Sequence, residues 1–102
     1  MKFGSLRLLK GKYINGNGVY LCLEDEKEGP YASVTVNIPP VTTGNIIAIN
    51  GDFANCCDKE LVEEVIEKIT TTKHCFVQSG FTTYECHKLK EGILDEIEDC
   101  DR

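Results

Sequence analysis

The clearest pattern of apolar and polar residues in the chain is the alternation in the segment YASVTVNI, residues 31–38. Successive side chains of a strand point to opposite faces of a sheet. The segment is therefore predicted to be a strand whose apolar face is formed by Ala32, Val34, Val36 and Ile38. Pro39 and Pro40 cannot donate to a ladder of hydrogen bonds, so the strand is predicted to end there.

Shorter apolar runs predict further strands on both sides of this one. The segments SLRLLKGKYI and VYLCLEDE flank the turn-forming NGNG and are predicted to pair as a hairpin. The run NIIAIN predicts a strand at Ile46 to Ile49. TTKHCFVQ and FTTYECHKL predict a second hairpin around Ser79 and Gly80. If these two residues form the turn, Gln78 faces Phe81 and Cys75 faces Tyr84.

The period of the apolar residues changes to that of a helix from Asp58 onward, and Asp58 itself is a suitable N-cap. The apolar stripe of this predicted helix consists of Leu61, Val62, Val65, Ile66 and Ile69. A last amphipathic helix, weakened by Gly92, is predicted from Leu89, Ile93, Leu94 and Ile97. The order ββββ-α-ββ-α predicts an α+β fold, in which an antiparallel sheet of about five to six strands carries both helices on one face.

Composition and length place this pattern in one folded domain. The chain has 102 residues, of which 41% are hydrophobic, and it contains only three prolines. A chain of this size can bury one core, so residues 1–102 are predicted to form a single domain. No apolar run is long enough for a signal peptide or a membrane span, which predicts a cytoplasmic protein. In a reducing compartment its six cysteines would be thiols.

Charge is distributed unevenly along the chain. Residues 1–23 carry four basic groups and no acidic one, whereas residues 24–102 carry seventeen acidic and seven basic groups. A surface of that sign repels nucleic acid and anionic membranes and attracts basic partners. The acidic residues recur at helical spacing in both predicted helices. They would form rows along exposed helix faces and are predicted to bind a partner: Glu60, Glu63, Glu64 and Glu67, then Glu91, Asp95, Glu98 and Asp99.

The segment HCFVQSGFTTYECH, residues 74–87, holds both histidines and two cysteines, and it raises the question of a metal or redox site. Two cysteines and two histidines suit tetrahedral zinc. However, His74-Cys75 and Cys86-His87 are adjacent pairs on predicted strands, so each pair points to opposite faces. One ion could not be held by all four side chains, and no metal or other cofactor is predicted. The same divergence argues against a Cys86-His87 catalytic pair. A Cys75-Cys86 bridge remains open, as does burial of both cysteines as small apolar residues.

Three segments together resemble a family of small bacterial proteins described as domain of unknown function 4313: GPYASVTVNIP (29–39), NIIAINGDFANC (45–56) and QSGFTTYECHKL (78–89). Members of that family occur mainly in gut Firmicutes, on conjugative elements and prophages. The resemblance implies this genetic context and no catalytic residues. Other members tend to continue the hairpin with uncharged or aromatic residues, where this chain has Glu85, Cys86 and His87. The sulfur and imidazole are therefore not a requirement of the family.

These observations lead to one hypothesis and its rivals. The chain is predicted to be a non-enzymatic acidic protein of a mobile element, which inhibits host defence of the CRISPR or restriction type. It would do so by occupying a basic surface of a host nucleic-acid-binding protein or nucleoprotein complex, without binding nucleic acid or membrane itself. The alternative is a small-ligand or zinc-binding regulatory domain that uses the 74–87 hairpin. A cysteine nucleophile is a third reading, and exposed strand edges leave a homodimer open.

Overall fold

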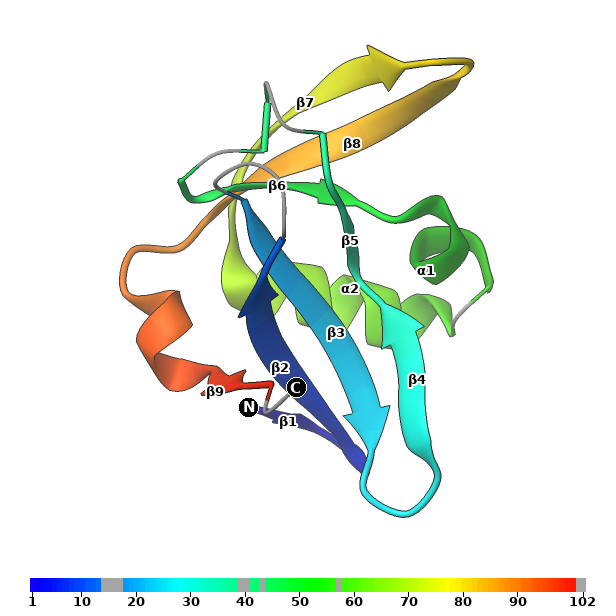
Figure 1. The fold of residues 1–102 in the computed structure, drawn as a ribbon, viewed down its shortest axis with the longest axis vertical. Coiled ribbons are helices and arrows are strands. Elements are labelled where there is room, and N and C mark those ends of the chain that lie inside the picture. The colour runs from blue at the N-terminus through cyan, green and yellow to red at the C-terminus, as the bar shows by residue number, and fades with distance from the viewer. Residues whose placement is uncertain (14–17, 39–40, 43, 57, 101–102) are drawn as a thin grey trace.

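The computed structural model describes residues 1–13, 18–38, 41–42, 44–56 and 58–100. Their strands form two sheets (Figure 1). A five-stranded sheet contains β1 (Lys2–Phe3), β2 (Leu6–Lys12), β3 (Val19–Asp25), β4 (Gly29–Ser33) and β9 (Glu98–Asp99). A four-stranded sheet has the order β5 (Thr35–Val36), β6 (Ile46–Ile49), β8 (Thr82–Leu89) and β7 (Thr70–Ser79). The helices are α1 (Gly51–Cys56), α2 (Lys59–Ile69) and the 3-10 turn η1 (Ile93–Glu96).

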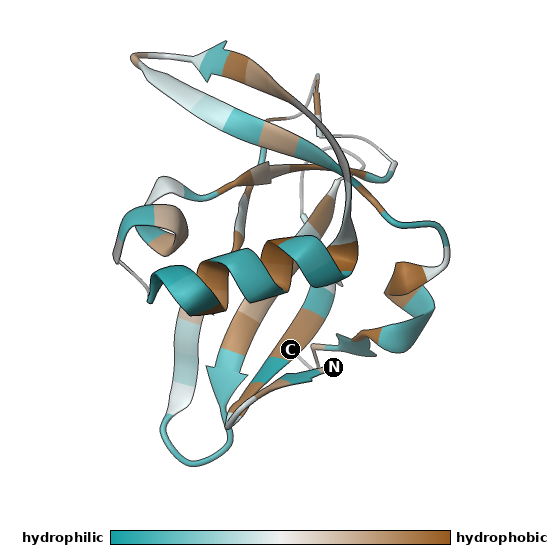
Figure 2. Cartoon of the chain, turned by 180° about the vertical axis from the view of Figure 1, so that it is seen from behind, coloured by the Kyte–Doolittle hydropathy of each residue, from teal (hydrophilic) through white to brown (hydrophobic). Residues whose placement is uncertain are grey.

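The helix α2 lies across one face of the five-stranded sheet, as the two opposite views show (Figures 1 and 2). Apolar residues of that sheet, of β6 and of both α-helices meet there in one buried cluster. Its fully enclosed members include Leu8, Leu21, Leu23, Val65 and Ile69. The α+β class predicted from the sequence is confirmed, but the prediction of one sheet is wrong because the strands divide between two. In the part of the chain described, no helix is long and apolar enough to cross a membrane.

The division between the sheets occurs at Val34, inside the segment predicted as one strand. Val34 donates its N–H to the carbonyl of Leu21 over 2.9 Å, and its own carbonyl accepts from the N–H of Asn50 over 2.8 Å. The backbone therefore leaves β3 and joins the residues after β6 at this point. Thr35, on the face predicted to be polar, is buried and accepts a hydrogen bond from the Leu21 N–H. Apolar and polar residues alternate in the sequence on both sides of Val34, so the sequence pattern does not reveal the change of sheet.

The first hairpin is confirmed, since β2 and β3 pair antiparallel with Leu8 opposite Leu23. Most of the predicted turn NGNG lies outside the described residues, which resume at Gly18. A Cβ atom at Gly18 would lie 2.4 Å from the carbonyl oxygen of Thr42. Glycine is needed here because the backbone passes too close to Thr42 for a side chain.

The predicted strand at Ile46–Ile49 and the helix after Asp58 are both confirmed. The helix buries Val62, Val65 and Ile69, which belong to the predicted stripe, and half-buries Leu61 and Ile66. The short helix α1 just before it was not predicted. Asn50 begins α1 by accepting a hydrogen bond from the Asp52 N–H over 3.0 Å, and Phe53 is 1% exposed in the core.

The predicted last helix is wrong. Strand β8 continues to Leu89, and Gly92 then adopts a left-handed backbone with φ of 77°. A residue with that φ cannot belong to a right-handed helix that runs from Leu89 to Ile97. After the single 3-10 turn, β9 pairs parallel with β2, with Leu9 opposite Glu98. Ile93 and Ile97 are nevertheless buried, and both belong to the main apolar cluster.

The N-cap of α2 gives a direct test of this part of the fold. Replacing Asp58 with alanine removes the carboxylate that accepts from the Glu60 N–H over 3.1 Å. The free energy of unfolding should fall by about 1 kcal/mol. Urea denaturation followed by circular dichroism measures this change. Asp58→Asn is the matched control because asparagine caps as well as aspartate. An equal loss in both variants would contradict the capping role.

Candidate binding surface

Four glutamates lie along the exposed side of α2: Glu60, Glu63, Glu64 and Glu67, which we name the acidic row. Their positions follow from the burial of the opposite apolar stripe, since residues three and four apart share one side of a helix. In Figure 2 the polar bands of α2 face outward over the sheet. The Lys59 ammonium lies 4.0 Å from the Glu63 carboxylate, but both side chains are more than half exposed, so this pair is weak.

The second set of predicted binding residues does not form a helical row. Glu91 lies in the turn after β8, Asp95 is on η1, and Glu98 and Asp99 are on β9. All four are exposed. Because β9 is extended, Glu98 and Asp99 point to opposite sides of the strand. The prediction that these four residues form a second row along a helix is therefore wrong. They are spread over residues 91–99, which we call the acidic tail segment.

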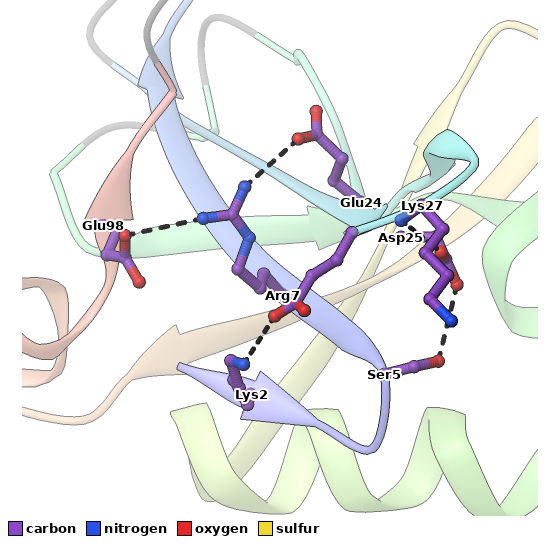
Figure 3. Close-up of polar contacts among 8 residues, drawn as sticks. Lys2, Ser5, Arg7, Glu24, Asp25, Lys27 and Glu98 are labelled. Carbon is purple, nitrogen blue, oxygen red and sulfur yellow. Dashed lines mark hydrogen bonds and ion pairs between the residues drawn. The ribbon is translucent and has the colours of Figure 1, made fainter.

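The basic N-terminal strands are engaged with acidic groups of the chain itself (Figure 3). Arg7 lies between two carboxylates, with distances of 3.4 Å to Glu24 and 3.9 Å to Glu98. Lys2 forms an ion pair with Glu26 and thereby lowers the pKa of that carboxyl group. The uneven charge of the sequence is thus partly compensated within the five-stranded sheet. Glu98 belongs to this network, whereas the acidic row lies on a different element.

The turn between β3 and β4 explains a further part of the acidic sequence. The Asp25 carboxylate accepts hydrogen bonds from the backbone N–H groups of Lys27 and Glu28, at 2.8 and 3.1 Å. These bonds lower the pKa of Asp25 because they favour its ionised form. Asp25 is therefore a residue that forms the turn between β3 and β4. This segment is not part of the candidate binding surface.

The hairpin β7–β8 is confirmed, but its turn lies one residue later than predicted, so each residue of β7 faces a residue two positions further along β8. Ser79 faces Thr82, so the turn residues are Gly80 and Phe81, and Cys75 lies directly opposite Cys86. Gly80 has φ of 64°, which is the conformation that a turn with glycine at its first central position requires. The hairpin extends beyond the rest of its sheet (Figure 1), and Phe81 at its tip is fully exposed.

Both faces of β8 are covered where the hairpin meets the rest of the chain. Cys86 is 1% exposed and packs with Ile38 and Ala48 in a small cluster. His87, on the opposite face, is 6% exposed. Cys86 and His87 are therefore both buried, although they lie on opposite faces of β8. Strand alternation separates the adjacent Cys86 and His87 as predicted.

The metal candidates are not brought together in the part of the chain described. Within it, no group of three or more histidine, cysteine, aspartate or glutamate side chains could hold a metal ion. His74 faces His87 in the strand register, but its side chain lies outside the described part. Cys75 and Cys86 form one cross-strand pair, and His87 is directed to the other face.

Sequence reasoning missed the pairing of His87 with Glu85. The two residues are two apart on β8 and therefore share a face, where His87 Nε2 lies 2.5 Å from Glu85 Oε1. His87 also lines a pocket of about 510 Å³ between the end of α2 and the start of β7, together with Ile66, Glu67, Thr70, Thr71 and Lys90. The spacing of Glu85 and His87 on a strand was the signal available in the sequence.

Comparisons with models of protein families, with curated proteins and with solved structures give no match for this chain.

Proposed function

We propose that this chain is a binding protein that places the acidic row of α2 against a basic, nucleic-acid-binding surface of another protein. The observation that carries the proposal is that all four glutamates of the row are exposed on the outer side of a helix anchored by buried Val62, Val65 and Ile69. The helix holds the backbone of the row in place before binding, so little backbone conformational entropy is lost on association.

The spacing of the row supports this partner class. From Glu60 to Glu67 the helix rises by about 10.5 Å, at 1.5 Å per residue. Four phosphates of one strand of a DNA duplex occupy about the same length along the duplex axis, because each phosphate of a strand corresponds to about 3.4 Å of that axis. The row therefore presents a linear charge density close to that of one strand of a DNA duplex, measured along the duplex axis. A groove lined by lysine and arginine would attract both by the same long-range field.

The row is also unfavourable for the isolated helix. Glu60 and Glu64 are four residues apart, as are Glu63 and Glu67. Each such like-charge pair destabilises a helix by about 0.2 to 0.5 kcal/mol. A helix surface with charges of both signs would stabilise the fold more. In contact with a basic partner, attraction between the glutamates and the partner would offset the repulsion among the glutamates.

The resemblance to a family from conjugative elements and prophages directs the proposal toward one biological setting. In that setting, we propose that the partner is a nucleic-acid-binding component of a host defence system of the CRISPR or restriction type. The protein would act by occupying the basic surface and would catalyse no reaction.

A regulatory domain that binds a small ligand in the pocket beside His87 is the second candidate, favoured by the volume and the charged lining of that pocket.

Competition with nucleic acid tests the proposal. Immobilised protein should retain a nucleic-acid-binding protein from a nuclease-treated lysate of a gut Firmicute, identified by mass spectrometry. Added double-stranded DNA or structured RNA should release it in a dose-dependent manner, because both ligands would use the same basic surface. Retention that nucleic acid does not diminish would contradict the proposal. A regulator that binds only a small ligand would retain no such protein.

A further inference from the structure

The hairpin β7–β8 places two thiols directly opposite each other. Cys75 on β7 is the register partner of Cys86 on β8, and both carry free thiols. Opposite residues of an antiparallel pair have Cα atoms about 4.5 to 5.5 Å apart. Disulfides span Cα distances of about 4.4 to 6.8 Å, so the usual spacing of opposite residues is compatible with a bond between Cys75 and Cys86.

The two cysteines differ in their access to solvent. Cys75 is exposed on the edge strand of its sheet, whereas Cys86 is 1% exposed and packs against Ile38 and Ala48. Burial raises the pKa of the Cys86 thiol, and the neighbouring Cys75 raises it further. An oxidant in solution can therefore reach Cys75 first, and direct reaction of Cys86 is expected to be slower.

We propose that Cys75 and Cys86 are a reversible redox site, in which a low-molecular-weight disulfide such as glutathione disulfide converts the opposed thiols into a cross-strand disulfide. The inference rests on the strand register and the burial of the pair, and it does not depend on the function proposed for the acidic row. It assigns the exposed thiol the role of entry point and the buried thiol the role of resolving group.

The reaction proceeds by two thiol–disulfide exchanges. The Cys75 thiolate attacks one sulfur of the glutathione disulfide, the bond between the two glutathione sulfurs breaks, and one glutathione thiolate leaves and takes a proton from water. Cys86 then loses its proton and attacks the Cys75 sulfur, which releases the second glutathione. The pair loses two electrons and two protons in total, and one glutathione disulfide becomes two glutathione thiols. Excess glutathione reverses both steps.

The crosslink would fix the free edge of the four-stranded sheet. Strand β7 has ten residues and pairs on one side with β8. A bond from Cys75 to Cys86 ties this edge strand to a residue enclosed in the small apolar cluster. Opening of the hairpin, which exposes unpaired backbone groups, should therefore be slower in the oxidised protein.

Peptide mapping tests the proposal in the full-length protein. Trypsin cleaves after Lys73 and Lys88, and the peptide between them contains Cys75 and Cys86 and no other cysteine. After incubation of the folded protein with glutathione disulfide, this peptide should lack two hydrogens and resist alkylation by iodoacetamide. Dithiothreitol should restore both alkylation sites. A peptide that still takes two alkyl groups, or that carries a stable glutathione adduct without crosslinking, would overturn the proposal.

Single variants separate the two roles. Cys86→Ala should stop the reaction at a glutathione adduct on Cys75. In Cys75→Ser, which changes an exposed position, Cys86 should react with glutathione disulfide at least about tenfold more slowly than Cys75 does in the unmodified protein. Cys100→Ser is the matched control and should leave the crosslink intact. Rapid reaction of Cys86 in the Cys75→Ser protein would contradict the order of the two steps.

Discussion

Reversing the charge of the acidic row should weaken binding to the captured partner by at least about 100-fold, because each lysine would meet a like charge in the complex and such contacts cost several kcal/mol. The variant carries four substitutions: Glu60→Lys, Glu63→Lys, Glu64→Lys and Glu67→Lys. Surface plasmon resonance against the purified partner, at two salt concentrations, measures the loss. The wild-type affinity should fall steeply with salt, as expected for an interaction steered by charge.

A second variant with the same change in net charge controls for long-range effects. It reverses four exposed acidic residues outside the row: Glu28, Glu91, Asp95 and Glu96. This variant should slow association but retain affinity within about tenfold, because charges at the rim of an interface mainly affect the rate of association. Equal losses in the two variants would mean that net charge, and not the row, controls binding.

The reversed row should not unfold the protein. Lysine and glutamate have similar helix propensities, and the four positions are exposed on α2. The lysine nearest the N-terminus of the helix is unfavourable for the helix dipole by about 0.3 to 1 kcal/mol. The free energy of unfolding should therefore change by no more than about 1 kcal/mol. A larger change in urea denaturation would assign the binding loss to the fold.

The elements that could be predicted are those whose local pattern and tertiary burial agree. The helix from Lys59 to Ile69 has an N-cap, an apolar stripe and a polar side, and all three are used in the structure. The segment around Val34 shows the opposite case. Its alternation is genuine, but sheet membership depends on hydrogen bonds to Leu21 and Asn50, which are distant in sequence. No periodicity in 31–38 encodes that choice.

The sequence contained signals for two features that were predicted wrongly, the turn of the β7–β8 hairpin and the segment after β8. A glycine at the first central position of a two-residue turn would have placed Gly80 and Phe81 in the turn, and Cys75 opposite Cys86. Gly92 does not lie inside a helix as predicted, because its positive φ places it directly before a single 3-10 turn. Of the candidate site, the acidic row was therefore predictable, whereas the pairing of the two cysteines depended on a turn that lies one residue later than predicted.

The short helix α1 should be essential to stability although it has only six residues. Isolated helices shorter than about 12 residues are marginal in water, so α1 depends on tertiary packing. Its buried side chain, Phe53, is 1% exposed within the main apolar cluster, and α1 packs against α2 and β4. Truncating Phe53 to alanine should cost about 3 to 5 kcal/mol, because it removes apolar contacts and leaves a cavity. This is a large part of the roughly 5 to 15 kcal/mol that stabilises a domain.

Phe81→Ala is the matched control, because it deletes the same side chain from a fully exposed position. Its unfolding free energy should change by less than about 0.5 kcal/mol, whereas Phe53→Ala should lower the melting temperature by more than about 10 °C. Calorimetry measures both variants. Equal effects would contradict the burial of Phe53.

At temperatures where Phe53→Ala remains folded, the acidic row keeps its place on α2, so partner binding should be retained. Reversing the charge of the acidic row should instead weaken binding strongly and leave the melting temperature nearly unchanged. The two variants together separate what the helix pair needs in order to fold from what its outer side needs in order to bind.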